Sequence, residues 1–393
     1  MGIIVIEGAA NEARGHIGVL RDFSNNGIAS FQIHRKMIDI DELYYDAVDL
    51  LKEMISTKSI SREEKDVADV IEAAMLGYGL DVRRSGNNLW TVGHGFDPSK
   101  PTLLLNSHID TVKPVEGWSR DPFVPEEDEE GRLYGLGSND AGASVVSLMA
   151  AFRYVTAKEQ PCNYVFLASC EEEVSGRGGV ESVLPLLPRI DVAIVGEPTS
   201  LQPAIAEKGL MVLDGVATGV SGHAARNEGV NAIYKALEAI EKLRTLRFER
   251  ESAMLGPVKV SVTQINAGTQ HNVVPDRCEI VVDVRTTDAY SNVDTLDILR
   301  KAVGELCVLT PRSTRLNPSH IEPEHTLVKR LVMMGKKPSG SPTLSDQALM
   351  PFPSLKLGPG DSARSHTADE YVKLDEIREA IHTYTTLLDG YRL

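Results

Sequence analysis

Short apolar runs that lead into acidic residues or a histidine recur along this chain and constrain its fold most strongly. Such runs cover residues 103–105, 164–168 and 192–195, and each is bounded by polar or turn-forming residues. Continuous apolar runs of this length are typical of buried parallel strands. Open α/β sheets place their sites at the carboxyl ends of such strands. The pattern predicts an α/β fold with a mixed, mainly parallel sheet between helices.

The first run ends in His108 and Asp110, which are two residues apart. Side chains at positions i and i+2 of a strand point to the same side of the sheet. An imidazole and a carboxylate would therefore share one face, as in a metal-bound histidine whose other ring nitrogen is held by a carboxylate. The alternative is a loop histidine and aspartate without a metal.

Two later stretches offer further carboxylates. Asp140 lies among small residues at 137–143, just before a helix predicted over 143–156, and three glutamates at 171–173 follow the strand predicted at 163–169. An aspartate at a helix start is often only a cap, and the glutamates could be a solvated loop. Adjacent carboxylates repel one another, however, so a bound cation would explain their clustering.

The polar residues at the strand ends form one constellation. It contains His108, Asp110, Asp140, Glu172, Glu173, Glu197 and His366. Two histidines with several carboxylates suit Zn²⁺, with Co²⁺ or Mn²⁺ as alternatives. One tetrahedral ion would not use all these acids, whereas two ions bridged by a carboxylate would. One carboxylate would then remain free as a general base.

The chain divides into three parts. Residues 1–36 have no strong hydrophobic period, so we expect a poorly ordered extension, with Met37 as the natural start. Residues 37–212 and 319–393 read as a metal-binding catalytic domain. The alternating pattern that begins near 213 predicts an inserted α+β layer over 213–318. Within the catalytic domain, we expect helices at 41–56 and 61–75, the second capped by Ser61 and Glu64. A strand at 89–92 should pair with the one at 102–107.

Composition excludes some classes of partner. The formal net charge of −15 argues against binding to nucleic acid or to an acidic membrane surface. The four cysteines show no CxxC spacing and read as reduced thiols of a cytoplasmic protein. No apolar run approaches the length of about 18 residues that a membrane helix needs.

The same motifs resemble those of a known family in order and spacing, from about residue 40 to the C-terminus. They are His108-Ile-Asp110, Gly137-Ser-Asn-Asp140, Glu171-Glu172-Glu173, Gly196-Glu197-Pro198-Thr199, Ser221-Gly222-His223-Ala224, Asn272-Val-Val-Pro275 and His366. This set resembles the dizinc amidohydrolase and peptidase family that includes acetylornithine deacetylase, succinyl-diaminopimelate desuccinylase, aminoacylase and carboxypeptidase G. The resemblance implies a zinc-exopeptidase-like catalytic domain.

The resemblance also implies a role for each residue of the constellation. Asp140 would bridge two Zn²⁺ ions. His108 and Glu197 would complete one ion, and Glu173 and His366 the other. Asp110 would orient His108, and Glu172 would be the general base that takes a proton from the attacking water and passes it to the leaving amine.

In the family that the chain resembles, the inserted domain mediates dimerisation. The resemblance therefore implies a homodimer through residues 213–318, with His223 reaching the partner's site to stabilise the oxyanion. His223 alone would otherwise read as an ordinary turn histidine. Asn272 and Arg285 would contact the carboxylate or oxyanion of the substrate, whereas a surface salt bridge is the alternative for Arg285.

Residues 358–362 and His366-Thr367 look most like deacylases of N-acyl basic amino acids. This implies hydrolysis of N-acetylornithine to ornithine and acetate, in arginine synthesis. N-succinylornithine, N-acetyllysine, N-succinyl-diaminopimelate and a dipeptide are alternative substrates. A non-catalytic metal-binding homologue and a metal-dependent phosphatase are alternatives of other classes, but all ligands are present and few basic residues flank the motifs.

Overall fold

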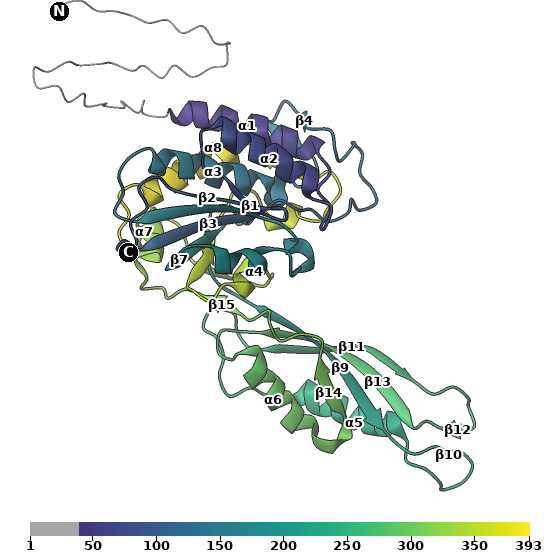
Figure 1. Cartoon of the computed structure of the whole chain (residues 1–393). Coiled ribbons are helices and arrows are strands. Elements are labelled where there is room, and N and C mark those ends of the chain that lie inside the picture. Colours follow the sequence, from purple (N-terminus) through teal and green to yellow (C-terminus); the bar gives the residue numbers. More distant parts are fainter. Residues whose placement is uncertain (1–38) are drawn as a thin grey trace, which may run out of the picture. The chain divides into compact units, whose positions relative to one another are not determined.

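A computed structural model describes residues 39–393 of the chain. The extension expected at residues 1–36 and the start expected at Met37 lie outside the described residues. The described part contains a large mixed sheet covered by helices and a smaller sheet whose strands lie between residues 209 and 311 (Figure 1).

The large sheet has nine strands in the order β1-β2-β6-β3-β7-β17-β8-β15, and β16 also pairs with β8. Its strands are β1 (Arg83–Ser85), β2 (Asn88–Val92), β3 (Thr102–His108), β6 (Asn163–Ser169), β7 (Val192–Val195), β8 (Ala204–Glu207), β15 (Ser319–His320), β16 (Ser339–Ser341) and β17 (Ser354–Lys356). The four central strands, β6, β3, β7 and β17, are mutually parallel. The predicted α/β class with a mixed, mainly parallel sheet is confirmed.

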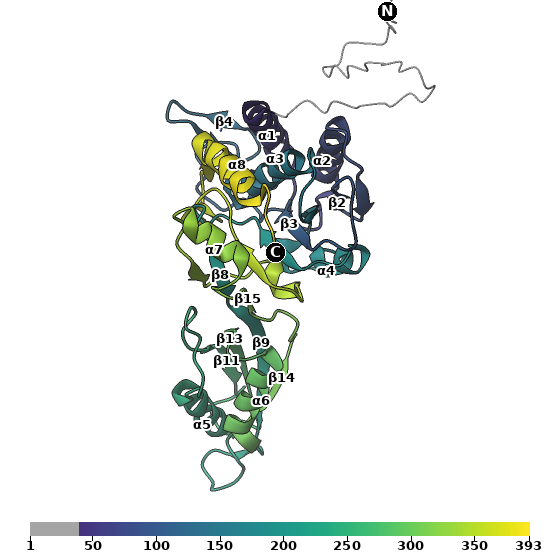
Figure 2. The same ribbon diagram turned by 90° about the vertical axis from the view of Figure 1, so that its left-hand side faces the viewer.

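Helices cover both faces of this sheet. They are α1 (Ile40–Ser56), α2 (Lys65–Gly77), α3 (Ala143–Thr156), α4 (Val180–Val183), α7 (Thr326–Met333) and α8 (Leu374–Leu388). Helices α1, α3 and α8 pack against one another on one face, and α4 lies on the opposite side (Figures 1 and 2). The alternation of side chains explains the layering, because Leu104 and Val165 pack with Val180 of α4 whereas Phe166 contacts Phe152 of α3.

The smaller sheet has the order β11-β13-β9-β14, and all its pairings are antiparallel. It contains β9 (Gly209–Thr218), β11 (Lys259–Ala267), β13 (Arg277–Thr286) and β14 (Val308–Pro311), with helices α5 (Ala232–Thr245) and α6 (Asn292–Val303). Alternate residues of β9 and β13 are buried, as expected for a sheet with one packed face. Between the strands of this sheet in chain order, β10 (Gly222–His223) and β12 (Val273–Val274) pair with each other as a short ribbon. A further small sheet contains β18 (Tyr371–Lys373), β5 (Arg132–Tyr134) and β4 (Glu126–Glu127).

Two local predictions are wrong. Strand β2 pairs with β6 and not with β3, because β6 occupies the position between them in the sheet. Helix α2 begins at Lys65, and the Ser61 hydroxyl does not cap it. Ser61 instead donates a hydrogen bond to Asp110, 49 residues further along the chain. Both predictions fail because the strand and the hydroxyl group bind partners that are distant in the sequence and not the nearest candidates.

Within residues 39–393, no helix is long and apolar enough to cross a membrane.

Candidate metal centre

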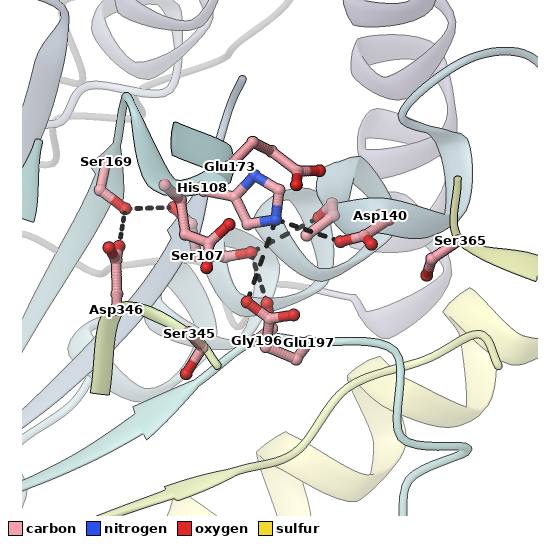
Figure 3. Close-up of polar contacts among 12 residues, drawn as sticks. Ser107, His108, Asp140, Ser169, Glu173, Gly196, Glu197, Ser345, Asp346 and Ser365 are labelled. Atoms are coloured by element: carbon pink, nitrogen blue, oxygen red, sulfur yellow. Dashed lines mark hydrogen bonds and ion pairs between the residues drawn. The ribbon is translucent and has the colours of Figure 1, made fainter. Parts of the chain in front are cut away.

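His108 is the last residue of the buried strand β3, and its ring is almost fully enclosed. Its Nε2 lies 3.1 Å from Asp140 Oδ1 and 3.9 Å from Glu197 Oε1. Its Nδ1 lies 2.9 Å from the backbone carbonyl oxygen of Asp110 and 3.6 Å from the Asp110 carboxylate. The ring is therefore held from behind by residue 110. Its Nε2 points at the Asp140 and Glu197 carboxylates, which come from two other segments of the chain (Figure 3).

The Asp110 carboxylate ties three segments together. It accepts hydrogen bonds from the Ser61 hydroxyl at 2.7 Å and from the backbone N–H groups of Glu172 and Glu173 at 3.0 and 3.1 Å. Burial alone would raise the pKa of Asp110, but His108 and these donors together lower it below its usual value. Asp110 is thus an anion that orients both the histidine and the glutamate loop.

Asp140 lies in an irregular turn, Ser138–Gly142, directly before helix α3. Gly137 precedes this turn with φ of 77°, and a side chain there would collide with Thr111 at 2.6 Å. The buried Glu370 holds the turn by accepting hydrogen bonds from three backbone N–H groups, including that of Asp140 at 2.9 Å. Because the backbone is held in this way, the Asp140 carboxylate is left to face His108 and His366.

The glutamate loop follows β6 and presents two side chains. Glu173 lies 3.0 Å from His366 Nε2, which is also 3.7 Å from Asp140 Oδ2. The Glu172 backbone N–H donates to Asp110, and the Glu172 carboxylate lies close to the Glu173 carboxylate and the His108 ring. Glu171, by contrast, turns away and accepts a hydrogen bond from the Gly178 N–H.

Among residues 39–393, three groups of side chains offer ligand atoms within 4.8 Å of one another. They are His108, Asp140 and Glu197; Asp140, Glu173 and His366; and His108, Glu172 and Glu173. The first two share Asp140, and they have the same composition as the two ligand sets expected from the sequence. The structure therefore brings the residues of the predicted constellation together from segments that are far apart in the sequence.

Electrostatics at this edge favour a cation. Burial, together with neighbouring acids, raises the pKa of Glu172 well above its usual value and raises the pKa of Glu197 to about 8. Glu197 Oε1 is buried and has no hydrogen-bond partner in the described part of the chain. A desolvated, unpartnered carboxylate oxygen within reach of an imidazole and a second carboxylate is costly unless a metal ion binds it. The donor set of imidazoles and carboxylates suits Zn²⁺, Co²⁺ or Mn²⁺.

A cavity of about 340 Å³ opens beside these ligands. Its lining includes the metal-ligand candidates Asp140, Glu173, Glu197 and His366, together with Glu172. Residues 339–344 and Lys356 also line it, and further lining comes from Pro198, Thr199, Gln202, Ala204, Ser362 and Ser365. A small organic substrate could occupy this space in contact with the bound metal.

The remaining predicted residues lie elsewhere, on the smaller sheet and its ribbon, and none of them lines this cavity. His223 and Asn272 are exposed neighbours, because β10 pairs with β12 and the Ala224 N–H donates to the Asn272 carbonyl. Arg285 is about one-third exposed and forms a two-pronged ion pair with Asp283. The structure therefore groups His223 with Asn272 and leaves Arg285 in a pair on β13.

Several buried groups around the site were not predicted. Glu370 supports Asp140, and burial raises its pKa to about 8. Asp346 accepts a hydrogen bond from the Ser169 hydroxyl at 2.6 Å, and burial raises its pKa to about 7 (Figure 3). Lys356 and Glu207 form a fully buried ion pair at 2.8 Å. In the sequence, no motif or strand-end pattern distinguishes these charged residues, so only tertiary contacts mark them.

Fold and site together define a metal-dependent hydrolase built on an α/β sheet with a metal centre at its carboxyl edge. Residues 104–390 match the model of the peptidase family M20/M25/M40, and the chain belongs to this family. Family and site make it a metal-dependent amidohydrolase or peptidase.

Two curated relatives of this chain carry the same name. The chain is 30% identical over 383 residues to an acetylornithine deacetylase of Proteus mirabilis, covering 88% of this chain and 97% of that protein. It is 30% identical over 363 residues to an acetylornithine deacetylase of Klebsiella pneumoniae, covering 83% and 92%.

Solved structures support the fold. An aminopeptidase of Bacillus cereus superposes with a TM-score of 0.71 at 17% identity, covering 90% of this chain and 99% of that one. A Bacillus subtilis protein described as a dinuclear metal binding peptidase superposes with a TM-score of 0.69 at 15% identity, covering 88% and 98%.

Proposed function

We propose that this chain hydrolyses the amide bond of an N-acyl amino acid, with N-acetylornithine as its substrate and ornithine and acetate as products. The observation that carries the proposal is the pair of ligand groups that share Asp140, with Glu172 beside them. The two curated relatives named acetylornithine deacetylase support the choice of substrate. Ornithine release would place the reaction in arginine synthesis.

Two metal ions fit the residues present. We infer that His108, Asp140 and Glu197 hold one ion, and that Asp140, Glu173 and His366 hold the other, with Zn²⁺ as the natural occupant. When bound, such ions polarise the substrate carbonyl and lower the pKa of a water molecule. Asp110 keeps His108 in place from behind, as outer partners of metal-ligating histidines generally do.

Glu172 is the residue that we assign as general base. Its backbone N–H is tied to Asp110, so its side chain projects from a fixed turn into the cavity. Glu172 takes a proton from the water that adds to the amide carbon, and it returns this proton to nitrogen as the carbon–nitrogen bond breaks.

His223 is the residue that we assign to the oxyanion. Its Nδ1 accepts a hydrogen bond from the Ala225 N–H at 3.1 Å, so the neutral ring carries its proton on Nε2. An exposed Nε2–H donor on a short ribbon can reach an oxyanion that forms in another site. We assign Asn272, its neighbour, and Arg285 to the substrate's carboxylate or oxyanion. Binding by Arg285 would require its guanidinium to leave Asp283.

A homodimer formed through residues 213–318 would deliver His223 to the partner's site. The exposed apolar side chains of this region support such an interface. They include Val220, Val230, Tyr234, Leu237 and Ile265, with exposed fractions of 44–71%. The four buried free thiols support a cytoplasmic location.

The test is amine release from a panel of N-acyl amino acids by the purified full-length protein. Metal is removed by chelation and restored with Zn²⁺, Co²⁺ or Mn²⁺. Metal-dependent release of ornithine from N-acetylornithine, above all other substrates, is the expected result. Preferential cleavage of N-succinylornithine, N-acetyllysine or a dipeptide would overturn the substrate, and metal binding without any cleavage would overturn the enzymatic role.

A further inference from the structure

Besides the metal ligands, residues Ser339–Leu344 line the cavity, and we call this segment the 339–344 wall. Its backbone joins the edge of the large sheet, because Ser341 pairs with Glu207 of β8 and the Lys208 N–H donates to the Ser341 carbonyl. A substrate group that fills the cavity would therefore contact both this wall and the metal ligands.

Lys356 supports this wall from the neighbouring strand β17. Its ammonium group lies 2.8 Å from Glu207 Oε2, 3.2 Å from both the carbonyl and the hydroxyl oxygen of Thr343, and 3.4 Å from the Ser341 hydroxyl. An ammonium group has three N–H donors, so these four acceptors use all of them. Glu207 also accepts a hydrogen bond from the Ser345 hydroxyl at 2.7 Å.

The pair is deeply buried, with Lys356 only 2% and Glu207 only 1% exposed. Burying two charges is expensive, and replacing such a pair with apolar residues often costs little stability. A role in the cavity is therefore a better explanation of the pair than stability alone. Among residues 39–393, Lys356 is the only lysine or arginine that lines the cavity. Because its donors are engaged and Glu207 neutralises its charge, Lys356 offers an incoming anion no free N–H donor.

We propose that the Lys356–Glu207 pair determines acyl-group specificity. It fixes the 339–344 wall and withholds the ammonium group from the substrate, so that an uncharged acyl group is accepted and an acyl group ending in a carboxylate is rejected. A terminal carboxylate would be desolvated against the hydroxyl groups of the wall without a free ammonium or guanidinium group to pair with. This inference rests on the proposed hydrolysis of N-acyl amino acids and specifies which acyl groups are used.

The test compares N-acetylornithine with N-succinylornithine in the metal-loaded full-length enzyme. Glu207→Gln removes the counter-ion of Lys356 and frees the ammonium for a substrate carboxylate. We expect the ratio of kcat/KM for the succinyl substrate to that for the acetyl substrate to rise by about tenfold or more. The double variant Glu207→Gln/Lys356→Met has no ammonium to offer and should restore the wild-type ratio. Glu322→Gln, which changes an exposed glutamate paired with His320, is the matched control.

Metal content and thermal melting establish that each variant is folded and loaded. An unchanged ratio in folded Glu207→Gln, or a double variant that behaves like the single one, would overturn the proposal. If Glu207→Gln does not fold, Thr343→Val takes its place. This variant removes one acceptor of the ammonium at the surface of the wall, and it should move the ratio a few-fold in the same direction. An unchanged ratio in Thr343→Val would then count against the proposal.

A second readout separates this proposal from the proposed function. Succinate and acetate are added to the metal-free proteins, and the shift in melting temperature is measured. Succinate should stabilise Glu207→Gln, or Thr343→Val in its place, more than it stabilises the wild type, whereas acetate should not discriminate. If neither acylornithine is cleaved but this difference appears, the proposed function fails and the role of the pair stands. If cleavage occurs but the difference and the ratio change are both absent, the specificity proposal fails alone.

Discussion

The carboxyl edge of the large sheet and the ribbon beside the small sheet carry the predicted functional residues in opposite environments. His108 and Asp110 are 2% and 1% exposed and are held by contacts from three segments. His223, in contrast, lies exposed on the short β10–β12 ribbon, and the exposed Asn272 directly precedes β12. A metal centre needs ligands oriented before the ion arrives, and burial with outer hydrogen bonds provides this. A residue that acts only when another surface covers it can stay exposed until then. The comparison predicts different consequences for substitutions in the two regions.

The largest effect is expected at Glu172. Glu172→Gln keeps the size of the side chain and the backbone contact to Asp110 but removes the base, so turnover should fall on the order of 10²–10⁴-fold. Metal content should stay at the wild-type level, as measured by elemental analysis. Glu322→Gln serves as the control. Activity near the wild-type level in Glu172→Gln would assign the base to another carboxylate.

The next effect is expected on the exposed side of the comparison. His223→Ala should lower kcat by roughly 10²-fold, because an oxyanion donor is lost. It should leave the melting temperature unchanged, since the His223 side chain is exposed and is not part of a buried core. His320→Ala, at another exposed histidine, is the control. A large loss of stability or of metal in His223→Ala would contradict the distinction between the two regions.

A smaller effect is expected at Asp110. Asp110→Asn keeps one carbonyl acceptor for the glutamate loop but removes the negative charge behind His108, so metal should bind about 10–100-fold more weakly. Competition with a chromogenic chelator measures this affinity. The result would be inconsistent with the proposed orientation of His108 if the affinity matched that of the wild type.

The smallest effect concerns stability and pH. The pKa of Asp346 is raised by burial to about 7, above the value of about 3.9 in an unfolded chain. The folded state therefore binds more protons in this window, and the wild type loses stability as the pH rises toward 7. Asp346→Asn removes this loss, so its free energy of unfolding relative to wild type should rise by about 3 kcal/mol between pH 5 and pH 8.

Urea unfolding of the metal-free proteins measures this difference. Asp214→Asn is the matched variant on the small sheet, where an exposed ion pair with Arg312 lowers the pKa of the aspartate. That titration lies below pH 5, so its difference from the wild type should stay constant in the same window. If the free energies of unfolding of the two variants, each relative to wild type, changed equally with pH, the predicted difference between the two regions would be wrong.

Prediction from sequence succeeded where the signal was local. Apolar runs at 163–169 and 192–195 became β6 and β7, and the helix predicted at 143–156 is α3. Prediction failed where the partner was remote. Nothing near residues 89–92 shows that β6 separates β2 from β3, and nothing near Ser61 shows that its hydroxyl serves Asp110 and not a helix. Strand β14 was not anticipated, because four residues are too short a pattern to recognise.

The sequence by itself determined the family, the α/β class and the residue types that converge on one sheet edge. It could do so because strand patterns and ligand residues are adjacent in the chain. Only the tertiary structure decided how these residues are supported. Glu370 beneath Asp140, Asp346 behind Ser169 and the Lys356–Glu207 pair behind the cavity wall are all long-range contacts. A single charged residue acquires such a role only when folding removes it from water and leaves one partner within reach, and no local pattern records that partner.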